Sequence, residues 1–298
     1  MTVLFDVCVI GHVARDINTI RAVEHAPSPG GAAYYSTMVY RRLGMRAAVV
    51  TKVALEDEPL LRELKDAGVA VFNLPSEVTT TFRNVYPTSN PDVRVQRVDA
   101  RAGPIAVAAL PDVRARIWHI GPLTKSDVEL AMIGRCAGLG GLVGMDVQGL
   151  TREVVDGQVR ASGPAAQTDH LRELDVLKAD EEEILTYTGA GSVEAAVARV
   201  RAAGVREVLI TYGSEGAVIY GSGAPISIAA VPPRRAVDAT GCGDTYLAAY
   251  LARRIETDDL RECGEFAAAA AAINIETFGA FRGSSAEIFE RRAAAGRR

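Results

Sequence analysis

Short apolar or β-branched runs alternate along the chain with segments in which apolar residues recur every three or four positions. The first pattern is typical of buried strands and the second of helices that cover them. The predicted strands are 5–11, 47–54, 69–74, 117–121, 141–147, 176–178, 208–212 and 217–220. The predicted helices are 32–43, 57–67, 126–137, 180–188, 192–203, 243–255, 261–277 and 285–294, with Ser126 and Ser192 as N-caps. The alternation predicts an α/β fold with helices on both faces of a mostly parallel sheet.

One region interrupts this alternation. Residues 79–101 place β-branched residues on both sides of a turn rich in Pro, Ser and Asn, which predicts a hairpin, and residues 12–29 are a candidate for a further short strand. The hairpin is either a structural element at the edge of the fold with no role in function, or a lid that excludes water from a site. We expect the lid. The length of 298 residues suits one large domain or two modest ones, and we expect a single domain over 1–298.

Composition narrows the classes of partner. A formal net charge of −4 provides no broad cationic surface, so we expect neither nucleic acid nor membrane as a partner, and small molecules instead. The four cysteines form no C-x-x-C pair and no Cys/His cluster, which argues against a zinc site and a disulfide framework. The N-terminus shows no cationic leader and no apolar run reaches the length of a membrane span, so we expect a cytoplasmic location.

The stretch DATGCGD, residues 238–244, leads into a predicted helix. The first N–H groups of a helix lack internal partners, so the amides of Gly241, Cys242 and Gly243 can hold an anion that the glycines allow to approach closely. Asp244 is then either a base that takes a proton from an alcohol attacking phosphorus, or a first-turn carboxylate stabilised by the helix dipole. The motif alone leaves both interpretations open.

These residues resemble the ribokinase-like, or PfkB, carbohydrate kinases, whose C-terminal signature is D-[TA]-x-G-x-G-D. The resemblance implies a three-layer α/β/α fold with a mostly parallel central sheet and a small β-sheet lid. It also implies an ATP-dependent kinase that uses Mg²⁺ to transfer the γ-phosphoryl group to a hydroxyl. In this family the last aspartate is the catalytic base, which assigns that role to Asp244, and the preceding amides form the anion hole, which assigns it to Gly241, Cys242 and Gly243.

The resemblance extends in the same order along nearly the whole chain. Residues 9–18 look like the family's first strand and lid entry, where Asp16 would bind sugar hydroxyls unless it is a solvated loop carboxylate. Residues 29–36 resemble the glycine pair that touches the substrate, and residues 211–220 the nucleotide-binding strand and turn; tight turns are the alternative for both. The implied residues are Gly30 and Gly31 for the substrate, and Thr211, Gly213, Ser214 and Gly216 for the nucleotide. Asn274, in an alanine-rich helix, faces either adenine or water.

Residues 177–189 are similar to the family's N-x-x-E segment, whose glutamate helps to organise Mg²⁺ through water. Glu181 takes the glutamate position. Lys178 replaces the asparagine, and it either contacts phosphate or is a surface charge. Asp238 and Thr240 fit the family's loop for a monovalent cation, which would be K⁺.

The acceptor can be narrowed by resemblance within the family. Tyr34 and Tyr35 stand where ribose kinases usually carry asparagine, which disfavours ribose. Residues 93–105, 144–159 and 176–183 look similar to plant-type myo-inositol kinases, so an inositol-like cyclitol is the leading acceptor. Gln148 and Arg152 are candidates to orient this acceptor. Arg152 could equally be a surface residue or contact a phosphate. The alternatives are a nucleoside or another sugar, or a non-catalytic sugar- or nucleotide-sensing protein, which would have no need of Asp244.

Other enzyme classes lack their signatures. No G-x-G-x-x-G follows the first strand, and no G-x-x-x-x-G-K-[ST] is present, which excludes a dinucleotide oxidoreductase and a P-loop enzyme. The histidines are isolated, which disfavours a metal hydrolase. The edges of the lid hairpin can pair with a second copy, so the sequence is compatible with a homodimer through the lid.

Overall fold

The computed structural model describes residues 3–20, 23–86, 95–164 and 168–296. Within these ranges the larger sheet has nine strands in the order β16-β15-β14-β13-β10-β9-β1-β5-β6. All neighbours from β14 to β6 pair in parallel, whereas β14, β15 and β16 pair antiparallel. The strands are β1 (Val3–Ile10), β5 (Ala47–Lys52), β6 (Ala70–Leu74), β9 (Val113–Ile120), β10 (Leu142–Asp146), β13 (Val176–Asp180), β14 (Glu207–Thr211), β15 (Ala217–Tyr220) and β16 (Ile226–Ile228).

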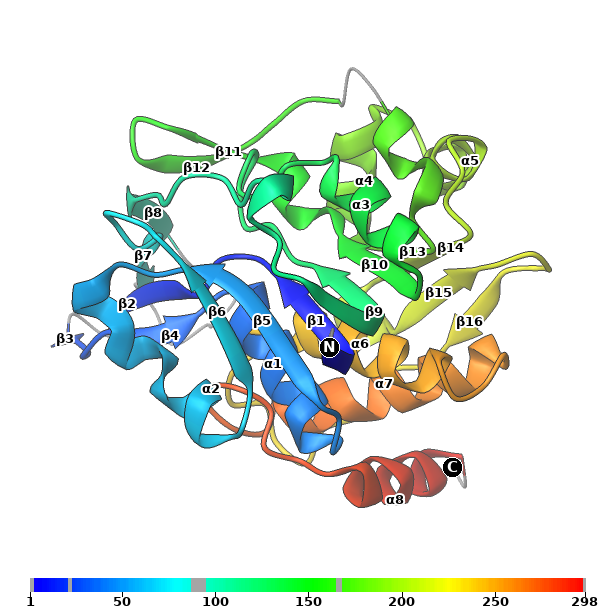
Figure 1. Ribbon diagram of the computed structural model, residues 1–298. Coiled ribbons are helices and arrows are strands. Elements are labelled where there is room, and N and C mark those ends of the chain that lie inside the picture. The colour runs from blue at the N-terminus through cyan, green and yellow to red at the C-terminus, as the bar shows by residue number, and fades with distance from the viewer. Residues whose placement is uncertain (1–2, 21–22, 87–94, 165–167, 297–298) are drawn as a thin grey trace.

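Helices lie on both faces of this sheet (Figure 1). One face carries α1 (Ala32–Arg42), α2 (Arg62–Asp66), α6 (Cys242–Arg254) and α7 (Leu260–Asn274), with α8 (Ser285–Ala295) packed on α7. The other face carries α3 (Met132–Leu139), α4 (Glu181–Thr188) and α5 (Val193–Ala202). In β1, Val7 and Val9 join one apolar core while Cys8 and Ile10 join the other, because successive side chains of a strand point to opposite faces. The predicted three-layer fold is confirmed.

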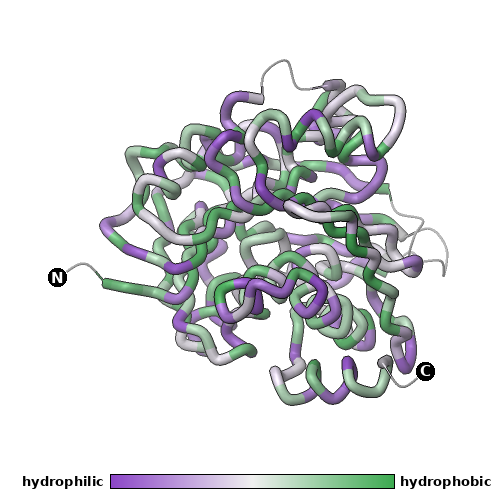
Figure 2. Tube along the Cα trace, turned by 90° about the vertical axis from the view of Figure 1, so that its right-hand side faces the viewer, coloured by the Kyte–Doolittle hydropathy of each residue, from purple (hydrophilic) through white to green (hydrophobic). Residues whose placement is uncertain are grey.

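Hydropathy follows this layering. Figure 2 shows apolar segments running through the interior, whereas the helix near the C-terminus alternates between hydrophobic and hydrophilic residues. In α7, Ala267 to Ala270 are all buried against α6 and the sheet. Their small side chains let the two helices approach closely, so the alanine-rich run is a buried helix, as expected. Among the helices described, none combines the length and apolar character that a membrane span requires.

A second, smaller sheet lies beside the first (Figure 1). Its strand order is β11-β12-β8-β7-β2-β3, and β4 pairs with β2. The strands are β2 (Ala14–Ile20), β3 (Val23–Glu24), β4 (Ser28–Gly30), β7 (Thr81–Tyr86), β8 (Val95–Ala100), β11 (Arg152–Val155) and β12 (Gln158–Ala161). The predicted lid segments 12–29 and 79–101 supply five of these strands, whereas β11 and β12 were not predicted. The turn at 87–94 lies outside the described residues.

Local departures from the predicted helices have identifiable causes. The helix predicted at 126–137 begins only at Met132, and Ser126 has a φ of +69°, so the prediction that it caps this helix is wrong. Asp127 instead accepts hydrogen bonds from the N–H groups of Leu123 and Thr124, which hold this segment as a loop. Ser192 does cap α5. The short 3₁₀ turns are η1 (Leu55–Leu61), which replaces the start of the helix predicted at 57–67, η2 (Val107–Ala109), η3 (Val147–Thr151), η4 (Asp169–Glu173) and η5 (Gly213–Glu215).

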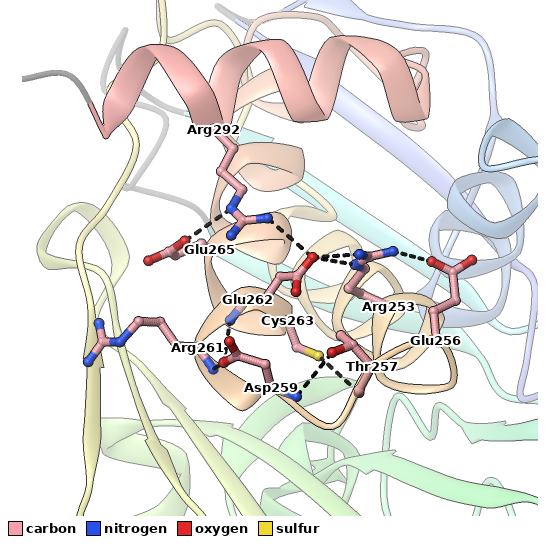
Figure 3. A network of polar contacts seen from close by, with 9 residues as sticks. All are labelled: Arg253, Glu256, Thr257, Asp259, Arg261, Glu262, Cys263, Glu265 and Arg292. Carbon is pink, nitrogen blue, oxygen red and sulfur yellow. Dashed lines mark hydrogen bonds and ion pairs between the residues drawn. The ribbon is translucent and has the colours of Figure 1, made fainter.

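Charged side chains join the last three helices at their outer surface (Figure 3). Arg253, near the end of α6, pairs with Glu262 of α7 and with Glu256. Arg292 of α8 pairs with Glu262 at 3.4 Å and with Glu265 at 3.0 Å. The network therefore links α8 to α7 and α7 to α6.

Candidate active site

A cavity of about 340 Å³ lies at the carboxyl ends of β10 and β13, where the larger sheet meets the smaller one. Ligands of open α/β sheets bind at such strand ends. The lining comes from the smaller sheet (Asp16, Phe82, Gln96), the start of α1 (Gly31, Ala32, Tyr35), the segments after β9 and β10 (Leu123, Asp146, Gln148, Arg152), β13 (Lys178) and the entry to α6 (Asp238, Ala239, Thr240, Gly241, Gly243, Asp244). The cavity thus brings together residues more than 200 positions apart in the chain.

Asp244 lies in the first turn of α6 and lines this cavity. The first hydrogen bond within the helix runs from the N–H of Thr245 to the carbonyl of Gly241 at 2.8 Å, so the N–H groups of Gly243 and Asp244 come before it. Gly241 has a φ of +75°, and a Cβ there would lie 2.8 Å from the ring of Tyr35. The helix can therefore begin beside Tyr35 only with glycine at this position.

Cys242 differs from its two glycine neighbours. Its N–H donates to the Ala239 carbonyl at 3.1 Å, and Cys242 does not line the cavity. Its thiol lies 3.8 Å from the carbonyl of Ala271 in α7. Of the three residues predicted for the anion hole, Gly241 and Gly243 line the cavity, whereas the Cys242 amide is engaged in the turn.

Asn274 supports the same turn from α7. Its amide donates to the carbonyl of Thr240 at 3.2 Å and to the sulfur of Cys242 at 3.5 Å. The side chain is only 1% exposed and does not line the cavity. Its contact with adenine remains a prediction, and in this structure the amide ties the start of α6 to α7.

The surroundings of Asp244 raise its pKa to about 7. Burial is the largest cause, and the negative charge of Asp146 adds to it, while Lys178 and Arg152 act in the opposite direction. A carboxylate with a pKa near neutrality is suited to accept a proton and to release it again at physiological pH. This favours the interpretation of Asp244 as a base over that of a simple dipole partner.

Lys178 and two carboxylates form a buried cluster beside Asp244. Lys178 Nζ donates to Asp146 Oδ2 at 2.9 Å and lies 3.9 Å from Glu183 Oε2. All three residues are buried. Lys178 is therefore not a surface charge.

The glutamates after β13 divide between two environments. Glu183 is buried and completes a capping box with Asp180 at the start of α4. Glu181 is exposed and does not line the cavity, so its link to Mg²⁺ remains a prediction. Asp146 and Glu183 are not among the site residues predicted from the sequence. Their signals were a carboxylate at the end of a predicted strand for Asp146, and the D-x-x-E spacing of a capping box for Glu183.

Asp16, in the smaller sheet, also lines the cavity. It lies in β2 between β4 and β7 and is 9% exposed. A Cβ at Gly30 would overlap the Asp16 carboxylate, so glycine allows β4 to pass close to it. Tyr35 also lines the cavity, and burial and then the charges of Asp16, Asp238 and Asp244 raise its pKa. Of the three residues predicted to bind the substrate, Asp16 and Gly31 line the cavity, whereas Gly30 lies against the Asp16 carboxylate and does not. Their contact with a substrate remains a prediction.

The residues predicted to hold the nucleotide lie at the end of β14 and in η5, outside the cavity lining. Gly213 and Ser214 are exposed, and Thr211 Oγ1 donates to the Ala179 carbonyl at 3.4 Å. A Cβ at Gly216 would overlap the Ile228 carbonyl, which makes this glycine necessary for the turn. Their contact with a nucleotide remains a prediction.

The residues predicted for cations occupy two places. Asp238 Oδ1 accepts a hydrogen bond from the Thr240 N–H at 2.9 Å, and both residues line the cavity. Over the described ranges, no group of three or more His, Cys, Asp or Glu side chains is placed to hold a metal ion. A Mg²⁺ ion that stays largely hydrated and binds through the phosphates of its ligand fits such a site, because it needs only one or two carboxylates such as Asp146 or Glu183.

Comparison with known proteins agrees with this geometry. Residues 148–286 match the model of the pfkB family carbohydrate kinases. Ribokinase from Arabidopsis thaliana is 35% identical over 116 residues, which are 37% of this chain and 31% of that enzyme. The cytidine kinase of Thermococcus kodakarensis is 26% identical over 279 residues, covering 87% of this chain and 92% of the enzyme.

Solved structures extend the likeness to the whole chain. A pyrophosphate-dependent kinase in the ribokinase family, solved with sulfate, has a TM-score of 0.83 and 25% identity, covering 95% of this chain and 99% of that one. A. thaliana ribokinase complexed with ribose and ATP has a TM-score of 0.76 at 20% identity, covering 98% and 99% of the two chains, and shares the fold. The chain is therefore similar to sugar and nucleoside kinases of the ribokinase type. Its residues 148–286 resemble the PfkB family of carbohydrate kinases, and the chain spans about a third of the length of the A. thaliana ribokinase that it matches.

Proposed function

We propose that this protein transfers the γ-phosphoryl group of ATP, with Mg²⁺, to a hydroxyl of a small polyol or sugar, with an inositol-like cyclitol as the favoured acceptor. One observation carries the proposal. A single cavity is lined by Asp244 and Gly243 at the start of α6 and by Asp16 of the smaller sheet. A proton acceptor, an anion cradle and a polyol ligand are what the transfer of a phosphoryl group to an alcohol requires.

Each residue has a definite task in this reaction. Asp16 accepts hydrogen bonds from acceptor hydroxyls and orients one of them towards Asp244. Asp244 takes the proton of that hydroxyl as its oxygen bonds to phosphorus and the bond to the leaving diphosphate breaks. The main-chain N–H groups at the start of α6 bind the oxygens of the migrating group. Mg²⁺ carried by the donor phosphates would neutralise their charge.

The lining is compatible with an uncharged ring. Gln96 and Gln148 add neutral donors and acceptors to Asp16, while Phe82 and Leu123 provide apolar surface. The local similarity to plant-type myo-inositol kinases favours a cyclitol. A nucleoside is the second candidate, because a cytidine kinase aligns with 87% of this chain.

Pyrophosphate is an alternative donor. The protein of similar structure at 25% identity is described as pyrophosphate-dependent. In addition, Thr211, Gly213 and Ser214, which would bind a nucleotide, lie outside the cavity that contains Asp244. A donor without a base and ribose would need only the phosphate-binding end of the site.

The test is a panel of reactions with the purified protein and Mg²⁺. ATP and pyrophosphate are each combined with myo-inositol, ribose, cytidine and adenosine, in K⁺ and in Na⁺, and phosphorylated products are detected by ³¹P NMR and mass spectrometry. We expect one acceptor to dominate, with myo-inositol ahead, and turnover to require Asp244. Binding of an acceptor, seen as a thermal shift, without product from any donor would instead establish a sensing protein.

The assembly can be tested in the same preparation. The strands of the predicted lid hairpin, β7 and β8, each already pair on both sides, so the prediction that their edges are open to a second copy is wrong. The edges of the smaller sheet are β11 and β3, and we propose that such an edge pairs with a second copy. Light scattering coupled to size-exclusion chromatography should then give twice the mass of 31.6 kDa. A mass of one chain at micromolar concentration would contradict the homodimer.

A further inference from the structure

Lys178 is a buried cation that has no role in the reaction proposed above. It lies in β13, one strand away from Asp146 at the end of β10 and just before α4 (Figure 1). Lys178 is only 4% exposed, yet it contributes to the wall of the cavity. The ammonium therefore faces an enclosed polar space and is nearly cut off from bulk water.

The charges around Lys178 keep it protonated. Burial alone would lower its pKa, but the carboxylates of Asp146 and Glu183 outweigh this effect and the pKa is raised. A lysine in this setting acts as a permanent positive charge. A buried ion pair is seldom more stabilising than apolar residues of the same size, so stability by itself gives little reason for placing one in the wall of a cavity.

The geometry directs this charge towards the start of α6. An ammonium has three N–H donors, and Asp146 at 2.9 Å takes one of them, whereas Glu183 at 3.9 Å is beyond hydrogen-bond distance. A Cβ at Gly243 would lie only 2.9 Å from Lys178 Nζ. Because position 243 has no side chain, the ammonium and the main chain of the first turn of α6 border the same space.

We propose that Lys178 binds a non-bridging oxygen of the phosphoryl group held at the start of α6, and so acts as a catalytic residue of the transfer site. The identity of the ligand rests on the proposed function. The ammonium supplies a fixed positive charge to an oxygen that also contacts the helix N–H groups, while Asp146 holds the lysine in place. In a site that contains Asp146, Glu183 and Asp244, this cation also reduces the repulsion that a phosphate would otherwise meet.

The test measures binding of inorganic pyrophosphate in EDTA by isothermal titration calorimetry, with no acceptor and no metal. Lys178→Met removes the charge, Lys178→Arg keeps it, and Lys65→Met is the matched control on the surface of α2, where Lys65 pairs only with an exposed Glu58. We expect Lys178→Met to weaken pyrophosphate binding about 10- to 100-fold, as for loss of a charged hydrogen bond. Lys178→Arg should recover most of the affinity, and Lys65→Met should bind like the wild type.

A second variant covers the case in which Lys178→Met does not fold, since it leaves Asp146 without its partner. Asp146→Asn combined with Lys178→Gln removes one charge of each sign and should show the same loss of affinity. If either folded variant binds pyrophosphate as tightly as the wild type, Lys178 is only a counter-ion and the proposal is overturned. The proposal is also overturned if the wild type binds no pyrophosphate.

This measurement is separate from turnover. Absence of product in the acceptor panel would refute the kinase reaction and leave the pyrophosphate result to decide the role of Lys178. With an active enzyme, a second readout is the pH profile. Lys178 lowers the pKa of Asp244, so Lys178→Met should move the acidic limb of kcat/KM to higher pH, and Lys178→Arg should return it. An unmoved limb in Lys178→Met would count against the proposal.

Discussion

The two ends of α6 carry similar charged groups in different surroundings. At the first turn, Asp244 lies beside Lys178 and Asp146, both of which are 4% exposed. At the last turn, Arg253 pairs with Glu262 and with Glu256, whose side chains are 24% and 59% exposed (Figure 3). The two ends of one helix therefore allow an enclosed cluster of charges to be compared with a solvated one.

The difference lies in how far water screens the charges. At the outer end, hydrogen bonds from Arg253 lower the pKa of Glu262, so this carboxylate prefers to be charged. At the inner end, burial and then Asp146 raise the pKa of Asp244 to about 7. The same kinds of group thus give a stabilising contact at the solvated end and a carboxylate of raised pKa at the end that the protein encloses.

The largest effect should come from Asp244→Asn, which keeps the shape of the side chain and removes the base. We expect kcat to fall by about 10²–10⁴ with little change in donor affinity, because only the interaction with the transferred proton is lost. Asp258→Asn, at the other end of α6 and 98% exposed, is the matched control. Equal kcat values for wild type and Asp244→Asn would exclude Asp244 as the base.

The pH dependence should follow the same residue. Asp244 must be ionised to accept a proton, so kcat/KM should be constant above a pKa of about 7 and fall about tenfold for each pH unit below it. Because half of Asp244 is already protonated at pH 7, the loss from pH 7 to pH 5 is about 50-fold. Initial rates over this range, with folding checked by circular dichroism, measure it, and a flat profile would contradict the assignment.

At the acceptor end, Asp16→Asn should raise the KM for the acceptor about tenfold or more and change kcat less, because a charged hydrogen-bond acceptor for hydroxyls is lost. Asp99→Asn is the control, since Asp99 lies in β8 of the same smaller sheet and pairs with Arg83 at the surface. If both variants have the KM of the wild type, the acceptor does not use Asp16.

The smallest effect on activity should come from the outer network. Glu262→Gln should leave kcat unchanged and lower the free energy of unfolding by about 0.2–1 kcal/mol at pH 7, a loss that high salt reduces. Because the pKa of Glu262 is lowered on folding, its contribution exists above its unfolded pKa and disappears as pH falls through the folded value. Urea unfolding at pH 7 and at pH 3 would show this.

The same unfolding experiment separates the two ends of α6 by the sign of the effect. The raised pKa of Asp244 favours folding only at low pH, and this contribution is lost as pH rises through about 7. Asp244→Asn should therefore be more stable than the wild type at pH 8, whereas Glu262→Gln should be less stable. Destabilisation by both variants at pH 8 would mean that burial of the charged form of Asp244 does not destabilise the folded protein.

Features that depend on neighbours in the chain were predictable. The alternation of strands and helices gave the three-layer fold, and the glycines before Asp244 indicated a helix start that can receive an anion. The D-x-x-E spacing at Asp180 was a readable capping box, although its buried Glu183 was passed over in favour of Glu181. Periodicity, capping and turn chemistry act over a few residues, so they are written into short stretches of sequence.

Features that depend on distant segments were decided only by the tertiary structure. It was packing between elements that buried Lys178 against Asp146, added β11 and β12 to the smaller sheet, and engaged the Cys242 amide. Whether a charge is screened by water or confined in a cavity depends on what the rest of the chain places around it. The sequence by itself therefore determined which groups are present and in what local conformation. The fold determined which of them lie close enough together, and are sufficiently shielded from water, to react.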